Sequence, residues 1–259
     1  MTGGIRVERN GAIATVIIDR PERMNAFTLD MYRRFGEAFE VLSVDDAVRC
    51  IIVTGAGDRA FCAGSDIGEF DDSRSGREQA RAYADFVNPM TDRLRFCRHP
   101  TVARISGACV GGGLEIASLC DIRISSSDSR FGIPVNRLGL TVDYYELELL
   151  AELAGRRGAL EILLEGRVFG AEEALRRNLV SRVVAPEELD AEVQATAERI
   201  ANAAPMVNRW HKAFVRRLAD ARPLTDAERD EPYRCYDTED YRAGTAAFRD
   251  KRRPVFEGR

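Results

Sequence analysis

The chain has 259 residues, of which 45% are hydrophobic and 31% charged, and its formal net charge is −4 at pH 7. This composition is typical of a globular protein with a sizeable core, and the acidic balance argues against a nucleic-acid or anionic-membrane binder. No apolar run is long enough to cross a bilayer, and the N-terminal stretch lacks the apolar region of a signal peptide, so we expect a cytoplasmic protein. Six dispersed cysteines and two histidines predict reduced thiols and no metal site.

The N-terminal part of the chain predicts a hairpin, a helix and a buried strand. Asn10-Gly11 is a two-residue turn signal between the strands expected at 5–8 and 12–19. Thr28 is a candidate N-cap for a helix with one apolar face. The wholly apolar run at 50–54 predicts a strand that is covered on both faces.

The next segment contains a glycine that frees one backbone amide. Gly64 allows a sharp turn, so the N–H of Ser65 is a candidate to face a cavity, while Asp66 is a candidate cap for a short helix that begins at Ile67. Residues 71–76 are polar and predict a mobile surface loop. A long helix is expected over 78–97.

Three consecutive glycines form the centre of the sequence. A strand at 101–105 leads to Gly111, Gly112 and Gly113, which open a predicted helix. Amides at a helix start have no intrahelical partners and suit an anion or a developing oxyanion. Glu115 follows in otherwise apolar surroundings, where a carboxylate is costly unless it is paired, hydrogen-bonded or protonated.

The remainder alternates short strands with helices and then becomes helical. Helices are expected at 144–153, 159–164 and 171–177, with a β segment at 179–184. A recurring strand–strand–helix unit indicates a spiral stack. We therefore expect a core over residues 1–186 that holds the site and a helical region over 187–259.

Several motifs together resemble the crotonase (enoyl-CoA hydratase/isomerase) superfamily, and the likeness spans nearly the whole chain in order and spacing. The residues that carry the resemblance are Arg20-Pro21-Glu22, Asn25-Ala26, Phe61-Cys62-Ala63-Gly64-Ser65-Asp66-Ile67, Gly111-Gly112-Gly113-Leu114-Glu115, Cys120-Asp121, Phe131-Gly132 and the C-terminal run from Phe248 to Phe256.

The resemblance implies an α/β fold, namely a spiral of ββα units with C-terminal helices that build homotrimers, often paired into hexamers. It also implies an enzyme of acyl-CoA metabolism, such as fatty acid metabolism, with coenzyme A as part of the substrate, no permanently bound cofactor and no metal. The amides of Ser65 and Gly112 would form the oxyanion hole around the thioester carbonyl oxygen. Loss of one such donor typically costs roughly 3–4 kcal/mol.

The same resemblance implies the residues that contact substrate. The segments around Met24 and Ala63 would line the CoA channel, and two residues near the C-terminus would reach the CoA of a neighbouring subunit. For Lys251 a solvated C-terminal cation is the alternative interpretation. The full set of expected substrate or CoA contacts is Met24, Ala26, Ala63, Asp66, Ile67, Gly111, Pro134, Val135, Tyr144, Phe248 and Lys251.

The expected pair of catalytic glutamates is incomplete in this sequence. Glu115 matches the first, but Val135 stands where the second should follow Pro134. Asp143 aligns with the nucleophilic aspartate of the related 4-chlorobenzoyl-CoA dehalogenases, so it is a candidate second carboxylate; its alternative interpretation is the N-cap of the helix that follows. Tyr144 and Tyr145 are candidates for an acid or a pocket wall.

Three functions remain open on these residues. The first is a lyase or isomerase of the enoyl-CoA hydratase type, with Glu115 as general acid or base. The second is a decarboxylase of malonyl-type CoA thioesters, because residues 133–136 and 236–241 look similar to the methylmalonyl-CoA decarboxylases; Ser65 replaces the histidine of those enzymes. The third is a non-catalytic acyl-CoA binder that has lost its second glutamate.

Overall fold

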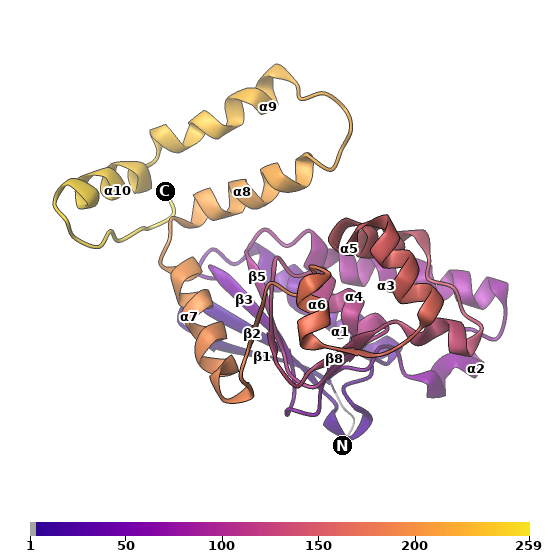
Figure 1. The fold of residues 1–259 in the computed structure, drawn as a ribbon. Helices are drawn as coiled ribbons and strands as arrows, with labels where there is room; N and C mark the ends of the chain where they lie inside the picture. The colour runs from indigo at the N-terminus through magenta and orange to yellow at the C-terminus, as the bar shows by residue number, and fades with distance from the viewer. Residues whose placement is uncertain (1–3) are drawn as a thin grey trace.

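Two β-sheets form the frame of the protein in a computed structural model that describes residues 4–259. Residues 1–3, which belong to the N-terminal stretch without a signal-peptide pattern, lie outside the described residues. Five strands of the six-stranded sheet run parallel and β1 pairs antiparallel with β2 (Figure 1). In spatial order this sheet contains β1 (Gly4–Asn10), β2 (Ile13–Asp19), β3 (Cys50–Gly55), β5 (Thr101–Ile105), β7 (Ile122–Ser126) and β10 (Arg182–Val184). The four-stranded sheet contains β4 (Ala60–Cys62), β6 (Ala108–Val110), β8 (Arg130–Gly132) and β9 (Phe169–Gly170).

Helices of very different lengths surround these sheets. The α-helices are α1 (Leu29–Val44), α2 (Phe70–Ser73), α3 (Arg77–Arg95), α4 (Gly112–Ser118), α5 (Tyr144–Glu165), α6 (Ala171–Arg176), α7 (Leu189–Ala201), α8 (Pro205–Arg217), α9 (Asp226–Asp230) and α10 (Glu239–Arg249). Short 3₁₀ helices lie at Pro21–Arg23, Ile67–Glu69, Pro134–Leu138, Pro186–Glu188 and Glu231–Asp237.

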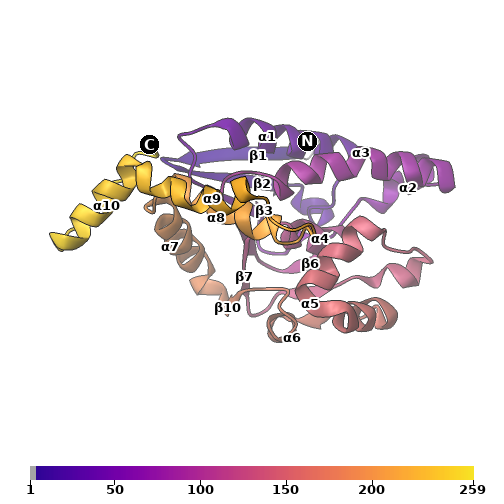
Figure 2. The same cartoon turned by 90° about the horizontal axis from the view of Figure 1, so that it is seen from above.

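The chain winds as a spiral of ββα units, as the sequence predicts. Each of β3, β5 and β7 lies in the large sheet, and the strand that follows it in the chain lies in the small sheet. A helical segment then closes the turn of the spiral, as α4 does after β5 and β6. Figure 2 shows α1 and α3 along one side of the molecule, with α5 and α6 on the other. The fold is therefore the α/β spiral that we expected.

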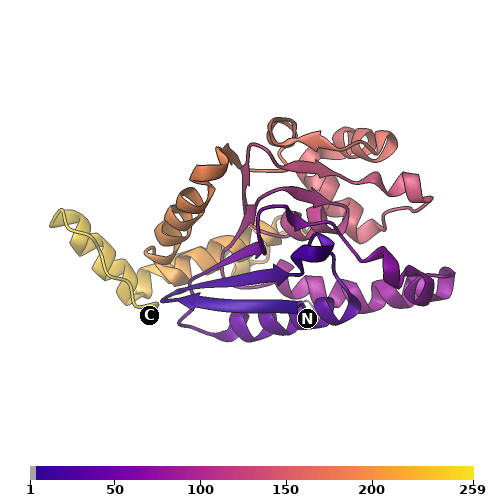
Figure 3. The ribbon, with the colours of Figure 1, turned by 90° about the horizontal axis from the view of Figure 1, so that it is seen from below.

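The strand β3 is buried on both faces, as its apolar run predicts. Because side chains alternate along a strand, Ile51 and Val53 contribute to the core beneath α1 and α4, while Cys50 and Ile52 pack with apolar residues of α7. Figure 3 shows α7 beside the strands of the large sheet. The helix α7 thus packs on the large sheet, although it belongs to the helical region expected over residues 187–259.

Local signals place several boundaries correctly. The hairpin turns at Asn10 and Gly11, and Gly11 has φ of 58°. Thr28 caps α1, its side chain accepting a hydrogen bond from Met31 N at 3.2 Å. Asp66 caps the 3₁₀ helix after it by accepting from Gly68 N at 2.9 Å. Each of these signals rests on contacts between near neighbours in the chain.

Three expectations need correction. The segment 71–76 is not simply a loop, because its first residues belong to α2 and one of its side chains turns inward, as described below. The helices expected at 144–153 and 159–164 form one helix, α5, interrupted at Gly155, whose φ of 71° breaks the helical geometry. The β segment expected at 179–184 shortens to β10.

The helices α8 to α10 form a C-terminal extension, in which α9 lies on the far side of α8 from the sheets (Figure 1). Large apolar side chains remain exposed there; they are Val215, Leu218, Tyr233, Tyr236, Tyr241, Phe248 and Val255. Within residues 4–259, no helix combines the length and the hydrophobicity needed to span a bilayer.

Candidate active site

The turn after β4 presents a backbone amide without a partner among the described residues. Gly64 has φ of 95°, a left-handed value that favours glycine. Its carbonyl accepts from Phe27 N at 2.8 Å, and Asp66 N donates to Phe27 O at 2.8 Å. Because successive amides in an extended segment point to opposite sides, the N–H of Ser65 faces away from Phe27, and no hydrogen bond to residues 4–259 uses it.

The N-terminus of α4 presents a second amide next to the first. Gly112 is the first residue of α4, so its N–H has no intrahelical partner. A Cβ built on Gly64 would lie 3.1 Å from Gly112 N, and a Cβ on Gly113 would collide with the carbonyl of Cys62. These glycines therefore allow the turn and the helix to touch. The adjacent amides of Ser65 and Gly112 suit an oxygen that gains negative charge.

Two glutamates meet beside these amides. Glu115 lies one turn into α4, and Glu146 lies in the first turn of α5. Both line a cavity of about 10 Å³, whose walls include Gly112 and Tyr32. This volume is close to the space that one water molecule requires. Tyr145, Leu149 and other residues of α3 to α5 close the cavity.

The two carboxyl groups hold their protons unusually strongly. Burial, followed by the charge of Glu146, raises the pKa of Glu115 well above its usual value. Burial also raises the pKa of Glu146, and the negative charge of Asp143 adds to the rise in both pKa values. A positive charge at Arg74 opposes these effects on the pKa of both glutamates. Two close carboxyls of this kind share a proton, and Glu115 is the favoured holder.

Asp143 occupies the N-cap position of α5. Its Oδ1 accepts from Glu146 N at 2.9 Å, and its Oδ2 accepts from Asn88 Nδ2 at 3.2 Å. Both carboxylate oxygens are thus engaged in holding the start of α5. The carboxyl that reaches Glu115 belongs to Glu146, three residues further on, so the second carboxylate comes from a residue that our sequence analysis did not select.

The two tyrosines after Asp143 have different environments. Tyr144 is 91% exposed in the single chain and does not line the cavity of the two glutamates. The physical reason is its place in the first turn of α5, on the side opposite the core. Tyr145 lines the cavity, and its hydroxyl donates to Asp92 Oδ1 at 2.7 Å.

The residues around the position expected for the second glutamate contact other parts of the protein. Pro134 opens the 3₁₀ helix that follows β8, and Val135 packs against the core. Gly111 has φ of 52°, and its N–H donates to the carbonyl of Gly132 at 2.9 Å, which ties α4 to β8.

Two segments expected to line a CoA channel lie side by side. Ala63 N donates to the carbonyl of Met24 at 3.0 Å. Arg20 joins the segments further, because its Nη1 lies 2.7 Å from Asp66 Oδ2 and 3.1 Å from the carbonyl oxygen of Ala26. The structure therefore brings these four predicted residues together next to the turn at Gly64.

Three other predicted contact residues lie at the surface. Ile67 is 60% exposed at the start of its 3₁₀ helix, and Phe248 is 85% exposed on α10. Lys251 follows α10 and is exposed. Phe248 belongs to α10 and Lys251 follows it, and α10 lies away from the sheets (Figure 1).

The aromatic side of the site is not apparent from the sequence. The Ser65 hydroxyl lies 3.1 Å from the Tyr32 hydroxyl and 2.9 Å from the Tyr83 hydroxyl. Tyr32 is on the buried face of α1, a position that its helical spacing indicates, but only the fold shows that its hydroxyl meets the site. For Glu146 the available signal was its place at the third helical residue after Asp143, where an acidic side chain is common.

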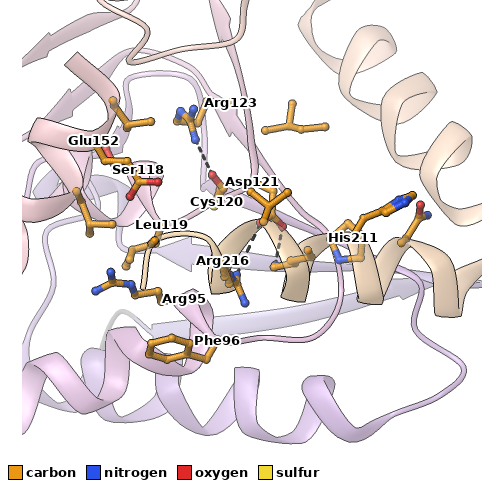
Figure 4. Close-up of a pocket in the computed structure, with 18 of the residues that line it drawn as sticks. Arg95, Phe96, Ser118, Leu119, Cys120, Asp121, Arg123, Glu152, His211 and Arg216 are labelled. Carbon is orange, nitrogen blue, oxygen red and sulfur yellow. Dashed lines mark hydrogen bonds and ion pairs between the residues drawn. The ribbon is translucent and has the colours of Figure 1, made fainter. Parts of the chain in front are cut away.

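A larger cavity of about 540 Å³ lies at the far end of α4, between the sheets and α8 (Figure 4). Asp121 stands in it beside Arg216, whose Nη2 lies 3.7 Å from the Asp121 carboxylate, and Lys212 Nζ lies 2.5 Å from the same carboxylate (Figure 4). The cavity contains neither free amide and neither glutamate. The ion pairs of Asp121 fasten α8 to the core, and the cavity meets the glutamate cavity only at Leu119 and Leu149.

Comparison with known proteins supports this fold. A sequence profile described as "Enoyl-CoA hydratase/isomerase" matches residues 8–259. The chain is 34% identical over 254 residues to the crotonyl-CoA hydratase of Syntrophomonas wolfei, with 97% of each chain covered. It is 31% identical over 252 residues to the 1,2-epoxyphenylacetyl-CoA isomerase of Escherichia coli, with 95% of each covered. A solved enoyl-CoA hydratase/carnithine racemase from Magnetospirillum magneticum superposes with a TM-score of 0.97 at 51% identity, covering 98% of this chain and 96% of the other.

The adjacent amides, the paired glutamates and these similarities define an enzyme of the crotonase superfamily. The chain belongs to its enoyl-CoA hydratase/isomerase family.

Proposed function

We propose that this enzyme hydrates short 2-enoyl-CoA thioesters. The observation that carries the proposal is the cavity of about 10 Å³ that Glu115 and Glu146 both line beside the amide of Gly112. It offers one water molecule a place between a carboxylate that can accept a proton and a carboxyl that can donate one.

In the proposed reaction, the amides of Ser65 and Gly112 donate hydrogen bonds to the thioester oxygen. Water adds its oxygen to C3, and its proton passes to the ionised carboxylate. The electron pair of the C2–C3 double bond moves toward the thioester, whose oxygen becomes an enolate oxygen. The protonated carboxyl then gives its proton to C2. Because its pKa is the more strongly raised, Glu115 is assigned as the donor and Glu146 as the acceptor.

The small space around the two glutamates favours a short acyl group over a long one. A second cavity of about 10 Å³ adjoins both carboxyls, and its apolar lining comes from Leu114, Ile133, Val142, Leu149 and Leu150. These side chains leave little room for a long chain. The proposed coenzyme A channel runs past the Met24 and Ala63 segments, and Phe248 and Lys251 are proposed to reach the CoA of a neighbouring copy.

The presence of Glu146 weakens both alternatives. The decarboxylase and the non-catalytic binder are alternatives because Val135 stands where the second glutamate is expected. Glu146 supplies a second carboxyl from α5 instead, so a hydratase needs no further group.

The test is turnover of crotonyl-CoA by the purified protein and its glutamine variants. We expect hydration, and we expect Glu115→Gln and Glu146→Gln each to lower kcat by roughly 10²- to 10⁴-fold, the usual contribution of a general acid or base. Glu148→Gln is the matched control, since Glu148 is exposed on the same helix and pairs with Arg95 at 3.0 Å.

Three outcomes would contradict parts of this proposal. Full activity of Glu146→Gln would remove Glu146 from the mechanism. Release of carbon dioxide from methylmalonyl-CoA, without hydration of crotonyl-CoA, would favour the decarboxylase. Binding of CoA thioesters with neither reaction would favour the non-catalytic binder.

A further inference from the structure

One arginine beside Ser65 has no anionic partner in the described chain. Arg74 follows α2, and its guanidinium carbon lies 3.6 Å from the centre of the Tyr83 ring and 4.4 Å from the centre of the Phe70 ring. Aromatic contacts of this kind fix the plane of a guanidinium, and its N–H groups point outward within that plane. Arg74 is thus held rigidly at the site.

Most donors of this guanidinium are unused. Its Nη2 donates to Ser65 Oγ at 3.1 Å, which is the hydrogen bond that the structure gives it. Its Nε is shielded from solvent and has no hydrogen-bond partner, and no carboxylate within residues 4–259 lies within 4.0 Å of it. A shielded cation without a partner is costly, and an arginine has five N–H donors to satisfy.

The position of Arg74 relates it to the acyl group. The hydrogen bond to Ser65 Oγ places the guanidinium next to the residue whose amide is proposed to bind the thioester oxygen. Ser65 Oγ also lies 3.1 Å from the Tyr32 hydroxyl, and Tyr32 lines the cavity of the two glutamates, so the guanidinium lies on that side of the site. Arg74 makes no ion pair with either glutamate, so neither carboxyl group uses its remaining N–H donors.

We propose that Arg74 binds a second carboxylate on the acyl group, so that the preferred substrates are CoA thioesters of short dicarboxylic 2-enoic acids. This inference rests on the proposed function, because it names the substrate class of the same site. The planar guanidinium matches a carboxylate through two parallel hydrogen bonds. The closeness of Arg74 to Ser65 requires that only a few carbon atoms separate the thioester from the carboxylate.

The second carboxylate takes no part in the bond changes. Water still adds its oxygen to C3 and C2 still receives a proton, while the distal carboxylate keeps its charge. Its function is to orient the acyl chain so that C3 faces the shared cavity of Glu115 and Glu146.

The test measures binding without turnover. Affinities of glutaryl-CoA and of its monomethyl ester, both saturated and unable to be hydrated, are compared by calorimetry. We expect the wild-type protein to bind the acid about 10- to 100-fold more tightly, as one charge-assisted hydrogen-bonded pair provides. Arg74→Met should abolish this preference, and Arg74→Lys should keep part of it.

Arg81→Met is the matched control, because Arg81 is exposed on α3 and its loss removes the same charge. It should leave the preference unchanged. Equal affinities of the wild-type protein for acid and ester would overturn the proposal, as would an unchanged preference in Arg74→Met. If Arg74→Met does not fold, the wild-type comparison and Arg74→Lys decide the question.

Turnover separates this inference from the proposed function. Glutaconyl-CoA and its methyl ester are offered to the wild-type protein and to Arg74→Met. Hydration of both by the wild type with equal kcat/KM would overturn the role of Arg74 and leave the hydratase intact. A binding preference that depends on Arg74, without any hydration, would support Arg74 and overturn the proposed reaction.

Discussion

At the scale of single residues, the site concentrates unfavourable charge. Glu115 and Glu146 face each other with Asp143 close by, and burial is the largest cause of the raised pKa of both glutamates. Such an arrangement is typical of catalytic groups, since a proton that is shared between two carboxyls is available for transfer near neutral pH. The same arrangement has a consequence for stability.

We expect Glu115→Gln to stabilise the fold increasingly as pH rises. Because the folded-state pKa of Glu115 is raised, its contribution is most favourable below the unfolded pKa of about 4.3 and is lost as pH rises toward the folded pKa. Over that window the folded chain binds more protons than the unfolded chain, so the stability of the wild type falls by up to about 1.4 kcal/mol per pH unit. Glutamine does not ionise, so the variant does not lose this folding stability as pH rises.

Denaturant unfolding at a series of pH values from 5 to 8 measures the effect. The difference between Glu115→Gln and the wild type should grow with pH, whereas Glu148→Gln, which alters an exposed carboxylate, should show no such trend. A difference that stays constant or shrinks with pH would contradict the raised pKa.

At the scale of elements, the site is the contact between the turn after β4 and the start of α4. Gly64 makes the contact possible in two ways, through its φ of 95° and through the absence of a Cβ beside Gly112 N. Neither turn nor helix contains the proposed oxyanion hole by itself. The separation of the two amides therefore depends on how closely these elements pack.

We expect Gly64→Ala to lower kcat by roughly 10²- to 10³-fold, as loss of an oxyanion donor does, because the added methyl group forces the turn away from α4. Gly57→Ala separates this effect from backbone strain, since Gly57 also has a left-handed φ, 70°, but a Cβ there meets nothing within 4 Å. Both variants should lose about 1–2 kcal/mol of stability. Steady-state kinetics with crotonyl-CoA gives the comparison, and equal kcat for the two variants would argue against the packed contact.

The elements themselves were largely predictable, and the site only partly. The buried strand β3 and the cap at Thr28 follow from the residues within a few positions of each. The approach of Glu146 to Glu115 depends instead on how α5 lies across α4, a contact between distant parts of the chain. The role of Arg74 also depends on a contact that the sequence does not show. Arg74 lies in a polar segment, which predicts exposure, but the Arg74 guanidinium stacks on Tyr83 of α3.

At the scale of the whole molecule, the C-terminal helices lack a core of their own. The helix α8 is tied to the sheets by Lys212, which is buried and donates to the carbonyl of His99 at 2.7 Å as well as pairing with Asp121. Beyond that attachment the helix leaves Val215 and Leu218 each 69% exposed. An exposed apolar surface of this kind commonly marks an interface.

We expect the purified protein to assemble into a homotrimer or a pair of trimers, and the double variant Val215→Lys/Leu218→Lys to weaken that assembly. The physical reason is that lysine charges oppose the burial of this side of α8 against another copy. Light scattering should give a mass that is a multiple of 28.8 kDa for the wild type and a shift toward 28.8 kDa for the variant.

The control exchanges two exposed apolar side chains of another helix, Leu160 and Leu164 on α5, for lysine. This double variant adds the same charge to a helix of the core region, so the mass of its assembly should equal that of the wild type. If the α5 variant dissociates while the α8 variant stays assembled, the contact between copies runs along α5 and the C-terminal helices do not build it. If the wild type itself has a mass of 28.8 kDa, the exposed side of α8 remains free in solution and each chain must complete its CoA channel without Phe248 and Lys251 of a neighbour.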